Sequence, residues 1–376
     1  MKRHLVATLL CTSLVLAFGL VATAAAGAAA GAAPYDLYFG DMHAHTDYSD
    51  GTGTPWQAYT AAKAAGADFF ALTDHTHYGY GTGWQTPSRY AETVALSEAF
   101  TDETFVAFAG YELWLPAVGE MNVFNTTEMF GQSGNPGDRG YNNGIRQSIR
   151  RVLPDLYAWL GETGAVGQWN HPGLYGAQGG SSLVDFFHFD WWTPQRDEGV
   201  TMVEVWNEEI YEDEYFEALD AGWHVLPSAN SDTHAADWIT GCDVRTVLLS
   251  EDLTREGLLG ALRASRGYAT MDEDLEVRYT LDGAVMGSDL APKASYEAKI
   301  EIKDPDGAGD EVKLVEIVAD GGEVVASKAF DEAEAEWTTV VTSKEERYFL
   351  VRVTTASDFW GNEGVTAWTA PVWTGR

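Results

Sequence analysis

The sequence predicts an α/β barrel followed by a β-sandwich, and three observations lead to this fold class. Between Tyr35 and about Met271, seven short apolar runs alternate with helical stretches. Strands and helices in strict alternation favour parallel pairing in a closed or nearly closed barrel. The last part of the chain instead alternates apolar with polar residues between Asp, Gly and Pro turns, which is typical of a β-sandwich. We therefore expect a barrel domain at 34–274 and a β-sandwich domain at 275–376.

Residues 1–33 have the composition of a secretory signal peptide. A short basic opening is followed by an apolar stretch between Leu5 and Val21 and then by several Ala-x-Ala sites. The alternative is a single membrane anchor, although the apolar stretch is short for a membrane span. Cys11 lacks the small residues that precede a lipoprotein cleavage site. We expect a secreted or extracytoplasmic protein without stable membrane insertion.

The strand candidates are short and rich in β-branched and aromatic residues. Helical spacing is clearest at 142–164, where Ile145, Ile149, Val152, Leu156 and Leu160 recur on one face. A second helix is expected at 54–66, with Pro near its start and Gly at its end. The seven expected strands are DLYFGDMH (36–43), ADFFALTDH (67–75), TFVAFAGYE (104–112), GAVGQWNH (164–171), GVTMVEVWN (199–207), WHVLPSANSD (223–232) and RTVLLS (245–250).

Two long irregular stretches, 114–143 and 172–198, follow the third and fourth expected strands. Loops of this length in a compact domain are commonly functional, and we interpret both as lids. Trp114 and Trp191 lie in them and are candidates for an apolar substrate wall. Filling of the core is the alternative for both side chains.

Charge and cysteine content exclude two features. The formal net charge is −34, and Lys63 is the only lysine between Pro34 and Thr270. Without a basic stripe to neutralise phosphates, a nucleic acid is disfavoured as a partner. Cys242 is the only cysteine beyond the signal segment, so no intramolecular disulfide is expected. The oligomeric state is left open.

Histidines and carboxylates stand at the ends of five of the seven expected strands. His43 and His45 are two residues apart, so both imidazoles leave the same face of an extended backbone. Because strand ends gather at one rim of a barrel, we expect a metal centre there. Imidazole and carboxylate ligands suit zinc, manganese or iron, and their number predicts two or three divalent ions. The candidate ligands are His43, His45, Asp50, His75, Glu112, His171, Asp232 and His234.

The motifs HAHTDYSDG, LTDH, a strand-end Glu, NHP and SDTH, in this order, resemble those of the polymerase and histidinol phosphatase (PHP) superfamily over residues 36 to about 270. VEVWN and the C-terminal AWTAPVWT are similar to a secreted branch related to carbaryl hydrolase. The resemblance implies a distorted seven-stranded (β/α)7 barrel with up to three metal ions. It implies one ion at His43, His45, Glu112 and Asp232, a second at Glu112 and His171, and a third at Asp50, His75 and His234.

The sequence departs from that family at one position. The family usually has a histidine in a context like GHMN, where this chain reads GEMN with Glu120. A carboxylate can still bind a hard cation, so Glu120 is a further candidate ligand. Its charge makes the second position more anionic.

Four polar residues are expected to support the ligands. Asp41 and Asp74 are predicted to accept hydrogen bonds from ligand imidazoles, with capping of a turn or helix as the alternative. Glu204 and Asn207 face the same rim if their strand is regular, with ordinary polar pairing between strands as the alternative.

The expected activity is hydrolysis of a small-molecule ester by a metal-bound hydroxide, without an assigned side-chain general acid. A hydroxide that bridges two cations is a strong nucleophile at neutral pH. Hydrolysis of a phosphoester is the commonest activity that the resemblance implies. The first alternative is hydrolysis of a carboxylic or carbamate ester or an amide with the same metals. The second is an inactive protein that binds a surface or a glycan.

Overall fold

A computed structural model of the 376-residue chain describes residues 35–77, 85–115, 118–131, 145–173, 186–305, 310–356 and 364–375. The predicted signal peptide lies outside these residues. Residues Ala33–Arg376 form one compact unit. Within the described ranges, no helix is both long and apolar enough to cross a membrane.

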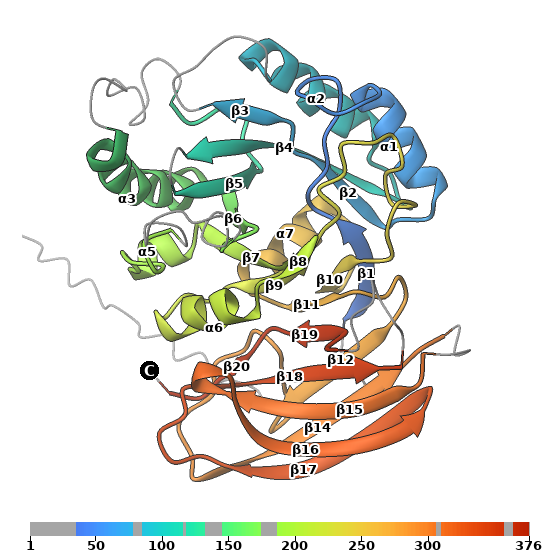
Figure 1. The fold of residues 1–376 in the computed structure, drawn as a ribbon, viewed down its shortest axis with the longest axis vertical. Helices are drawn as coiled ribbons and strands as arrows, with labels where there is room; N and C mark the ends of the chain where they lie inside the picture. The colour runs from blue at the N-terminus through green and yellow to red at the C-terminus, as the bar shows by residue number, and fades with distance from the viewer. Residues whose placement is uncertain are drawn as a thin grey trace, which may run out of the picture. The chain divides into compact units, whose positions relative to one another are not determined.

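The protein is a mixed α/β structure organised around one large sheet (Figure 1). The strands of the N-terminal part are β1 (Asp36–Asp41), β2 (Phe69–Leu72), β3 (His75–His77), β4 (Val106–Leu115), β5 (Gly119–Phe124), β6 (Val166–Asn170), β7 (Val200–Asn207), β8 (Glu209–Ile210), β9 (Leu226–Ala229), β10 (Arg245–Ser250) and β11 (Gly267–Thr270). The seven strands expected from the sequence are present as β1, β2, β4, β6, β7, β9 and β10.

Helices connect many of these strands. Helix α1 begins where the sequence predicts, because Thr54 and Gln57 form a capping box and Pro55 occupies the first turn. The predicted helix at 142–164 is present as α3. The helices are α1 (Pro55–Ala64), α2 (Pro87–Phe100), α3 (Ile145–Thr163), α5 (Pro194–Asp197), α6 (Glu212–Asp220) and α7 (Arg255–Arg263).

Strand pairing is parallel for β1–β2–β4 and for β6–β7–β9. It is antiparallel where β5 joins β4 to β6, and where β10 and β11 continue the sheet beyond β1. The expectation of strictly parallel pairing is therefore wrong at these strands. Strand β5 lies inside the stretch 114–143 that was expected to be a lid, yet all six of its residues are buried. A short connection after β4 suffices because antiparallel neighbours need no crossover helix.

The two edges of this part of the sheet approach each other at β9. The hydroxyl of Thr246 on β10 donates to the carbonyl of Ala229 on β9 and accepts from its N–H, both at 3.1 Å. Beyond the ends of β1 and β9, Ala44 forms an isolated parallel bridge with Thr233. These contacts bring the residues that follow β1 next to those that follow β9.

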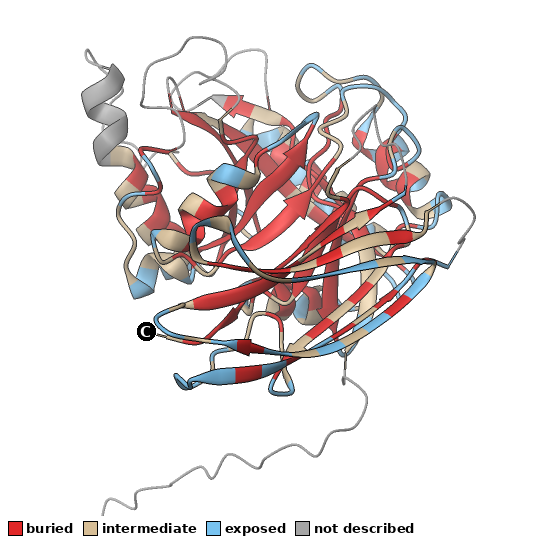
Figure 2. Ribbon diagram, turned by 60° about the horizontal axis from the view of Figure 1, so that its bottom comes forward, coloured by how far each residue is buried: buried red, intermediate tan, exposed pale blue. Residues whose placement is uncertain are grey.

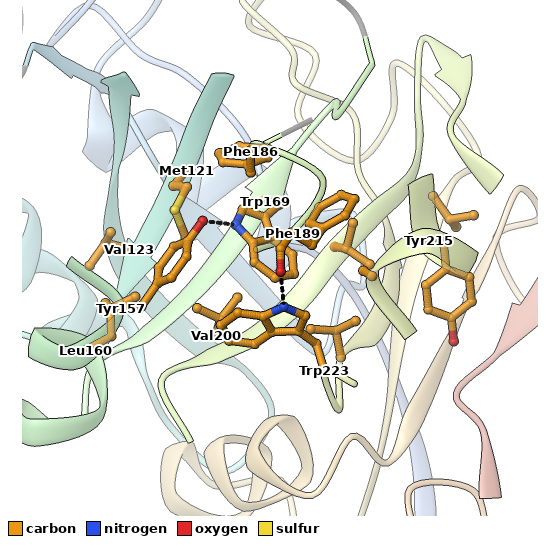
Figure 3. Close-up of a cluster of buried hydrophobic side chains, with 14 of the residues drawn as sticks. Met121, Val123, Tyr157, Leu160, Trp169, Phe186, Phe189, Val200, Tyr215 and Trp223 are labelled. Atoms are coloured by element: carbon orange, nitrogen blue, oxygen red, sulfur yellow. Dashed lines mark hydrogen bonds between the residues drawn. The ribbon is translucent and has the colours of Figure 1, made fainter. Parts of the chain in front are cut away.

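An aromatic cluster supports the outer face of β6 (Figure 3). Trp169 is fully buried, and its indole N–H donates to the Tyr157 hydroxyl at 3.0 Å. Phe186 and Phe189 pack on the same indole. Residues 186–189 belong to the stretch 172–198 that was expected to be a lid, but Phe186, Phe187 and Phe189 are buried in the core instead. Residues 174–185 of that stretch lie outside the described residues.

The C-terminal part is antiparallel and forms two layers. One layer is a separate four-stranded sheet, and the other continues the large sheet through β19, which pairs with both β11 and β18. Figure 2 shows buried residues along the central strands and many exposed ones on the outer strands. The strands are β12 (Glu276–Leu281), β13 (Ala284–Val285), β14 (Ser295–Lys303) and β17 (Glu334–Thr342) in the first layer, and β15 (Val312–Ala319), β16 (Glu323–Glu332), β18 (Tyr348–Thr355), β19 (Ala367–Thr369) and β20 (Val372–Trp373) in the second.

Two arginines hold helix α6: Arg352 lies within β18, and Arg347 directly precedes that strand. The Arg352 guanidinium donates to both carboxylate oxygens of Glu212, at 2.8 and 2.9 Å, and to Glu316 at 2.9 Å. At the other end of α6, Arg347 donates to the carbonyl and the carboxylate of Asp220. The predicted domains 34–274 and 275–376 are therefore joined by a shared sheet and by these ion pairs.

We expect Arg352→Met to destabilise the protein by about 2 kcal/mol, because it leaves two partly buried carboxylates without their cation. The matched control is Lys299→Met, which breaks an exposed pair with Glu301 and should cost less than about 1 kcal/mol. Urea denaturation followed by circular dichroism measures both. Equal losses for the two variants would contradict this role of Arg352.

Candidate metal centre

The nine predicted ligands converge in one region, although they come from six separate segments of the chain. His43, His45 and Asp50 follow β1, and His75 opens β3. Glu112 lies on β4 and Glu120 on β5, His171 follows β6, and Asp232 and His234 follow β9. Donor atoms of these residues form three groups, and within each group all donor atoms lie within 4.8 Å of one another. The first group is His43, His45, Glu112 and Asp232, the second is His75, Glu112 and Glu120, and the third is His45, Asp50, His75 and His234.

The first group matches the ligand set that the PHP resemblance implies for one ion. His43 Nε2 lies 3.1 Å from Asp232 Oδ1 and 3.3 Å from Glu112 Oε1. His45 Nε2 lies 2.8 Å from the same Asp232 oxygen. Donor atoms around a tetrahedral zinc ion are about 3.3 Å apart, given bonds of about 2.0 Å. The geometry of this group therefore fits a divalent cation.

Backbone pairing holds the two histidine-containing motifs against each other. The Asp232 N–H donates to the His43 carbonyl at 2.9 Å, and the His45 N–H donates to the Thr233 carbonyl at 3.0 Å. Asp232 has a positive φ of 48°, a conformation that is costly for a residue other than glycine. Backbone strain of this kind is typical of functional sites.

Glu204 fixes the orientation of His43. Its Oε1 lies 2.9 Å from His43 Nδ1, and the same oxygen accepts from the amides of Gln168 and Asn230. Its Oε2 accepts from the His171 N–H at 2.6 Å and from the Asn207 amide at 2.9 Å. With Nδ1 engaged by this carboxylate, His43 presents Nε2 to the first group, which is the arrangement that a metal-binding imidazole requires.

Asp41 and Asp74 do not accept from ligand imidazoles in the described contacts, unlike the expected role. Asp41 accepts from the backbone N–H of His43 at 3.0 Å and from Ser231. Asp74 accepts from Ser49 and from both the N–H and the hydroxyl of Thr46. Both carboxylates therefore stabilise the turns that carry the ligands, which is closer to the capping alternative.

Asn207 helps to position the Asp232 carboxylate, because its side-chain amide donates to Asp232 Oδ2 at 3.2 Å.

The second group differs from the set that the resemblance implies, because His75 belongs to it. His75 Nδ1 lies 2.7 Å from Glu112 Oε2 and 3.9 Å from Glu120 Oε1. His171 Nε2 lies 3.4 Å from Glu112 Oε1 and 3.4 Å from Glu120 Oε2. Glu112 thus directs one oxygen toward His43 and His171 and the other toward His75, as a bridging ligand would.

The third group faces the solvent. His234 Nε2 lies 3.3 Å from Asp50 Oδ1, and these side chains are 41% and 49% exposed. The turn that presents Asp50 depends on Gly51, since a Cβ there would lie 2.8 Å from the carbonyl carbon of His45. The His45 ring stacks against those of both His75 and His234, at centroid distances of 4.3 and 4.2 Å, and the latter two rings are 5.6 Å apart.

The two candidate wall tryptophans lie in different environments. Trp114 pairs with Glu120 across β4 and β5, and it is two residues from Glu112 on the same strand. Alternation along a strand therefore puts Trp114 on the face of Glu112 and Glu120. Trp191 instead packs on the apolar cluster under β6, with its ring 5.3 Å from that of Phe187. This position fits the core-filling alternative for Trp191.

Burial and carboxylates oppose each other in setting the protonation of the histidines. Burial alone would lower the pKa of His43, but Asp232, Glu112 and Glu204 raise it well above the ordinary value. Burial likewise opposes the nearby carboxylates at His75 and His171, where the pKa is raised to about 9 in each case. At His45 burial prevails, and the pKa is lowered. Without a cation, protons therefore compensate the negative charge of the centre.

Three buried amides were missed at the level of the sequence. Asn170 donates to Glu112 Oε1 at 2.8 Å, while Gln168 and Asn230 donate to Glu204. Gln168 and Asn170 flank Trp169 on β6, so strand alternation places both on the face opposite the aromatic cluster. A polar–apolar–polar pattern ending in a ligand histidine was the signal that could have identified them.

Among the comparisons with known proteins, only the comparison with solved structures finds matches to this chain. No family model matches the chain, and no curated protein does. A two-domain protein from Bacteroides vulgatus containing a predicted PHP-like metal-dependent phosphoesterase is 15% identical, with a TM-score of 0.46, covering 90% of this chain and 96% of its own. An amidohydrolase from Chromobacterium violaceum with bound sulfate and no metal is 18% identical, with a TM-score of 0.30, covering 52% and 87%. At these values, a functional assignment depends on the geometry of the site itself.

We expect Glu204→Gln to weaken metal binding by about 10- to 100-fold, because the neutral amide no longer holds the His43 ring as a carboxylate does. The matched control is Glu209→Gln on the exposed strand β8, which should bind metal like the parent. Titration with zinc in the presence of a competing chelator measures both affinities. Unchanged affinity in Glu204→Gln would exclude this role.

Metal affinity should rise with pH up to about 9. His75 and His171 have pKa values raised to about 9, so below that pH a cation must displace their protons. The same shift predicts that the metal-free protein loses stability as pH rises from about 6.5 to about 9, since a raised histidine pKa stabilises only the protonated form. Calorimetric titration in buffers of different ionisation enthalpy counts the released protons. Release of none at pH 7 would contradict the assignment.

Proposed function

We propose that the protein is a metal-dependent hydrolase of the PHP type, with a phosphoester of a small molecule as the favoured substrate. The proposal includes a distorted seven-stranded barrel that carries the centre, a C-terminal β-sandwich, and action outside the cytoplasm after removal of residues 1–33. The observation that carries it is the convergence of four imidazoles and four carboxylates in three overlapping groups of donor atoms, with a fifth imidazole, that of His171, 3.4 Å from Glu112. Few other functions require this set of side chains in contact.

The residues of the site would have different roles in such a metal centre. Divalent cations bound there would supply Lewis acidity and a water of lowered pKa. Glu204 and Asn207 orient His43 and Asp232, respectively. Glu112, which belongs to both the first and the second group of donor atoms, would hold the cations of these two groups close together. The exposed side chains of Asp50 and His234 mark the side from which a substrate can enter.

Hydrolysis of a carboxylic or carbamate ester or an amide is the second candidate, and one observation favours it. Among the described residues, the side chains that contact His43, His45 and Asp232 are imidazoles, carboxylates, amides and the Ser49 hydroxyl, without lysine or arginine. A phosphate dianion would benefit from such cations, whereas a neutral ester or amide does not need them. Trp114 on the same face suits an apolar group of either substrate.

A binding protein without activity is less well supported. That alternative rested on Glu120 as a departure from the family pattern. Glu120 lies within reach of His75 and His171, so the departure keeps a potential ligand in place.

The test is hydrolysis of nitrophenyl phosphate, a nitrophenyl phosphodiester and nitrophenyl acetate by protein purified without chelators and reconstituted with zinc, manganese or iron. We expect cleavage of a phosphate substrate, and a loss of at least about 100-fold in kcat/KM for the double variant His43→Ala and Asp232→Ala. The control is Glu209→Gln, whose side chain is exposed on β8 and belongs to none of the donor groups. Cleavage of the acetate alone would select the second candidate. Equal activity in the double variant would exclude the metal centre as the site of reaction.

A further inference from the structure

The three donor groups differ in chemistry. The third group offers three imidazoles and one carboxylate, and the first offers two of each. The second, formed by His75, Glu112 and Glu120, offers one imidazole and two carboxylates. His171 also lies 3.4 Å from both Glu112 and Glu120. The third position is therefore the one rich in imidazole, and Glu120 adds a carboxylate at the second position alone.

We propose that Glu120 makes the second position selective for a hard divalent cation of the manganese or magnesium class, relative to the imidazole-rich third position. This inference rests on the proposed metal centre but not on which bond the protein cleaves. Carboxylates suit manganese and magnesium, whereas imidazoles suit zinc, copper and iron. The protein would then hold a mixed centre when several metals are present.

The placement of Glu120 supports this selectivity. Strand β5 pairs with β4 and β6 on both sides, so the backbone of Glu120 is held by two ladders. The residue is only 7% exposed, and its two oxygens face His75 and His171 at 3.9 and 3.4 Å. A carboxylate held in this way contributes its charge and its oxygen donors at a fixed place.

Charge balance points in the same direction. Glu120 brings a negative charge to the second position in addition to Glu112, whose charge the first position shares. At the third position, Asp50 is the single carboxylate, and it is half exposed. A hard ion, for which electrostatic attraction dominates binding, gains more from the paired carboxylates than a soft ion does.

The substitution that isolates this effect is Glu120→His, which restores the residue type that the PHP resemblance implies. Zinc binds most nitrogen and oxygen sites more tightly than manganese, so the inference concerns the ratio of the two affinities. We expect Glu120→His to raise the zinc-over-manganese preference by at least about 10-fold at one equivalent per chain. The control is Glu301→His, which replaces an exposed carboxylate outside the donor groups, and its zinc-to-manganese ratio should equal that of the parent.

The experiment loads metal-free full-length protein with equal concentrations of zinc and manganese, removes unbound metal and counts both by elemental analysis. Electron paramagnetic resonance counts bound manganese independently. A second variant, Glu120→Gln, keeps the size of the side chain and removes its charge, and it should lose at least about 10-fold in manganese affinity. Circular dichroism confirms folding, so one of the two variants suffices if the other misfolds.

The outcomes separate this inference from the proposed function. A shifted metal ratio in protein that cleaves no ester tested would support the role of Glu120 and leave the reaction to be reassigned. Hydrolysis with the same zinc-to-manganese ratio in parent, Glu120→His and Glu120→Gln would overturn the inference alone. A chain that binds neither metal would overturn both.

Discussion

Two backbone hydrogen bonds between the segments after β1 and β9 are the constraint on which the rest of the centre depends. They link the His43 carbonyl to Asp232 and the Thr233 carbonyl to His45. Each motif, His-x-His or Asp-x-His, could occur on an ordinary turn. Paired in this way, they direct imidazoles and a carboxylate toward one point, although 187 residues separate His45 from Asp232. The positive φ of Asp232 shows that the chain accepts local strain to keep this arrangement.

The centre is stabilised as a network rather than as a set of separate ion pairs. Burial of unpaired charges costs far more than a fold of marginal stability can offset. Here Glu204 accepts five hydrogen bonds from His43, Gln168, Asn230, His171 and Asn207. Glu112 is fully buried and surrounded by imidazoles, which hold its pKa well below the usual range against the effect of burial. A divalent cation bound there would provide the same compensation without protons.

The sequence predicted which side chains converge better than it predicted the connections between their strands. Strand ends could be recognised because apolar runs of the β type stop at His, Asp or Glu, and all seven of those strands are present. Strand β5 was not predicted, because its six residues lie in a stretch rich in Gly, Asn and Pro. Its burial and its pairing with β4 and β6 are visible only in the structure. The sharing of His75 between two donor groups depends on ring orientation, which spacing along the chain does not encode. Asp41 was assigned to an imidazole, but the nearest donors are a backbone N–H and Ser231.

The proposed hydrolysis requires bound metal, and the metal content of the protein tests this requirement most directly. Full-length protein produced in medium replete with zinc, manganese and iron, and purified without chelators, can be dialysed and analysed for metals. The geometry predicts about two or more equivalents of divalent metal per chain, and about one fewer when His43 and Asp232 are both replaced by alanine. Less than about one equivalent in the parent protein would contradict the central claim.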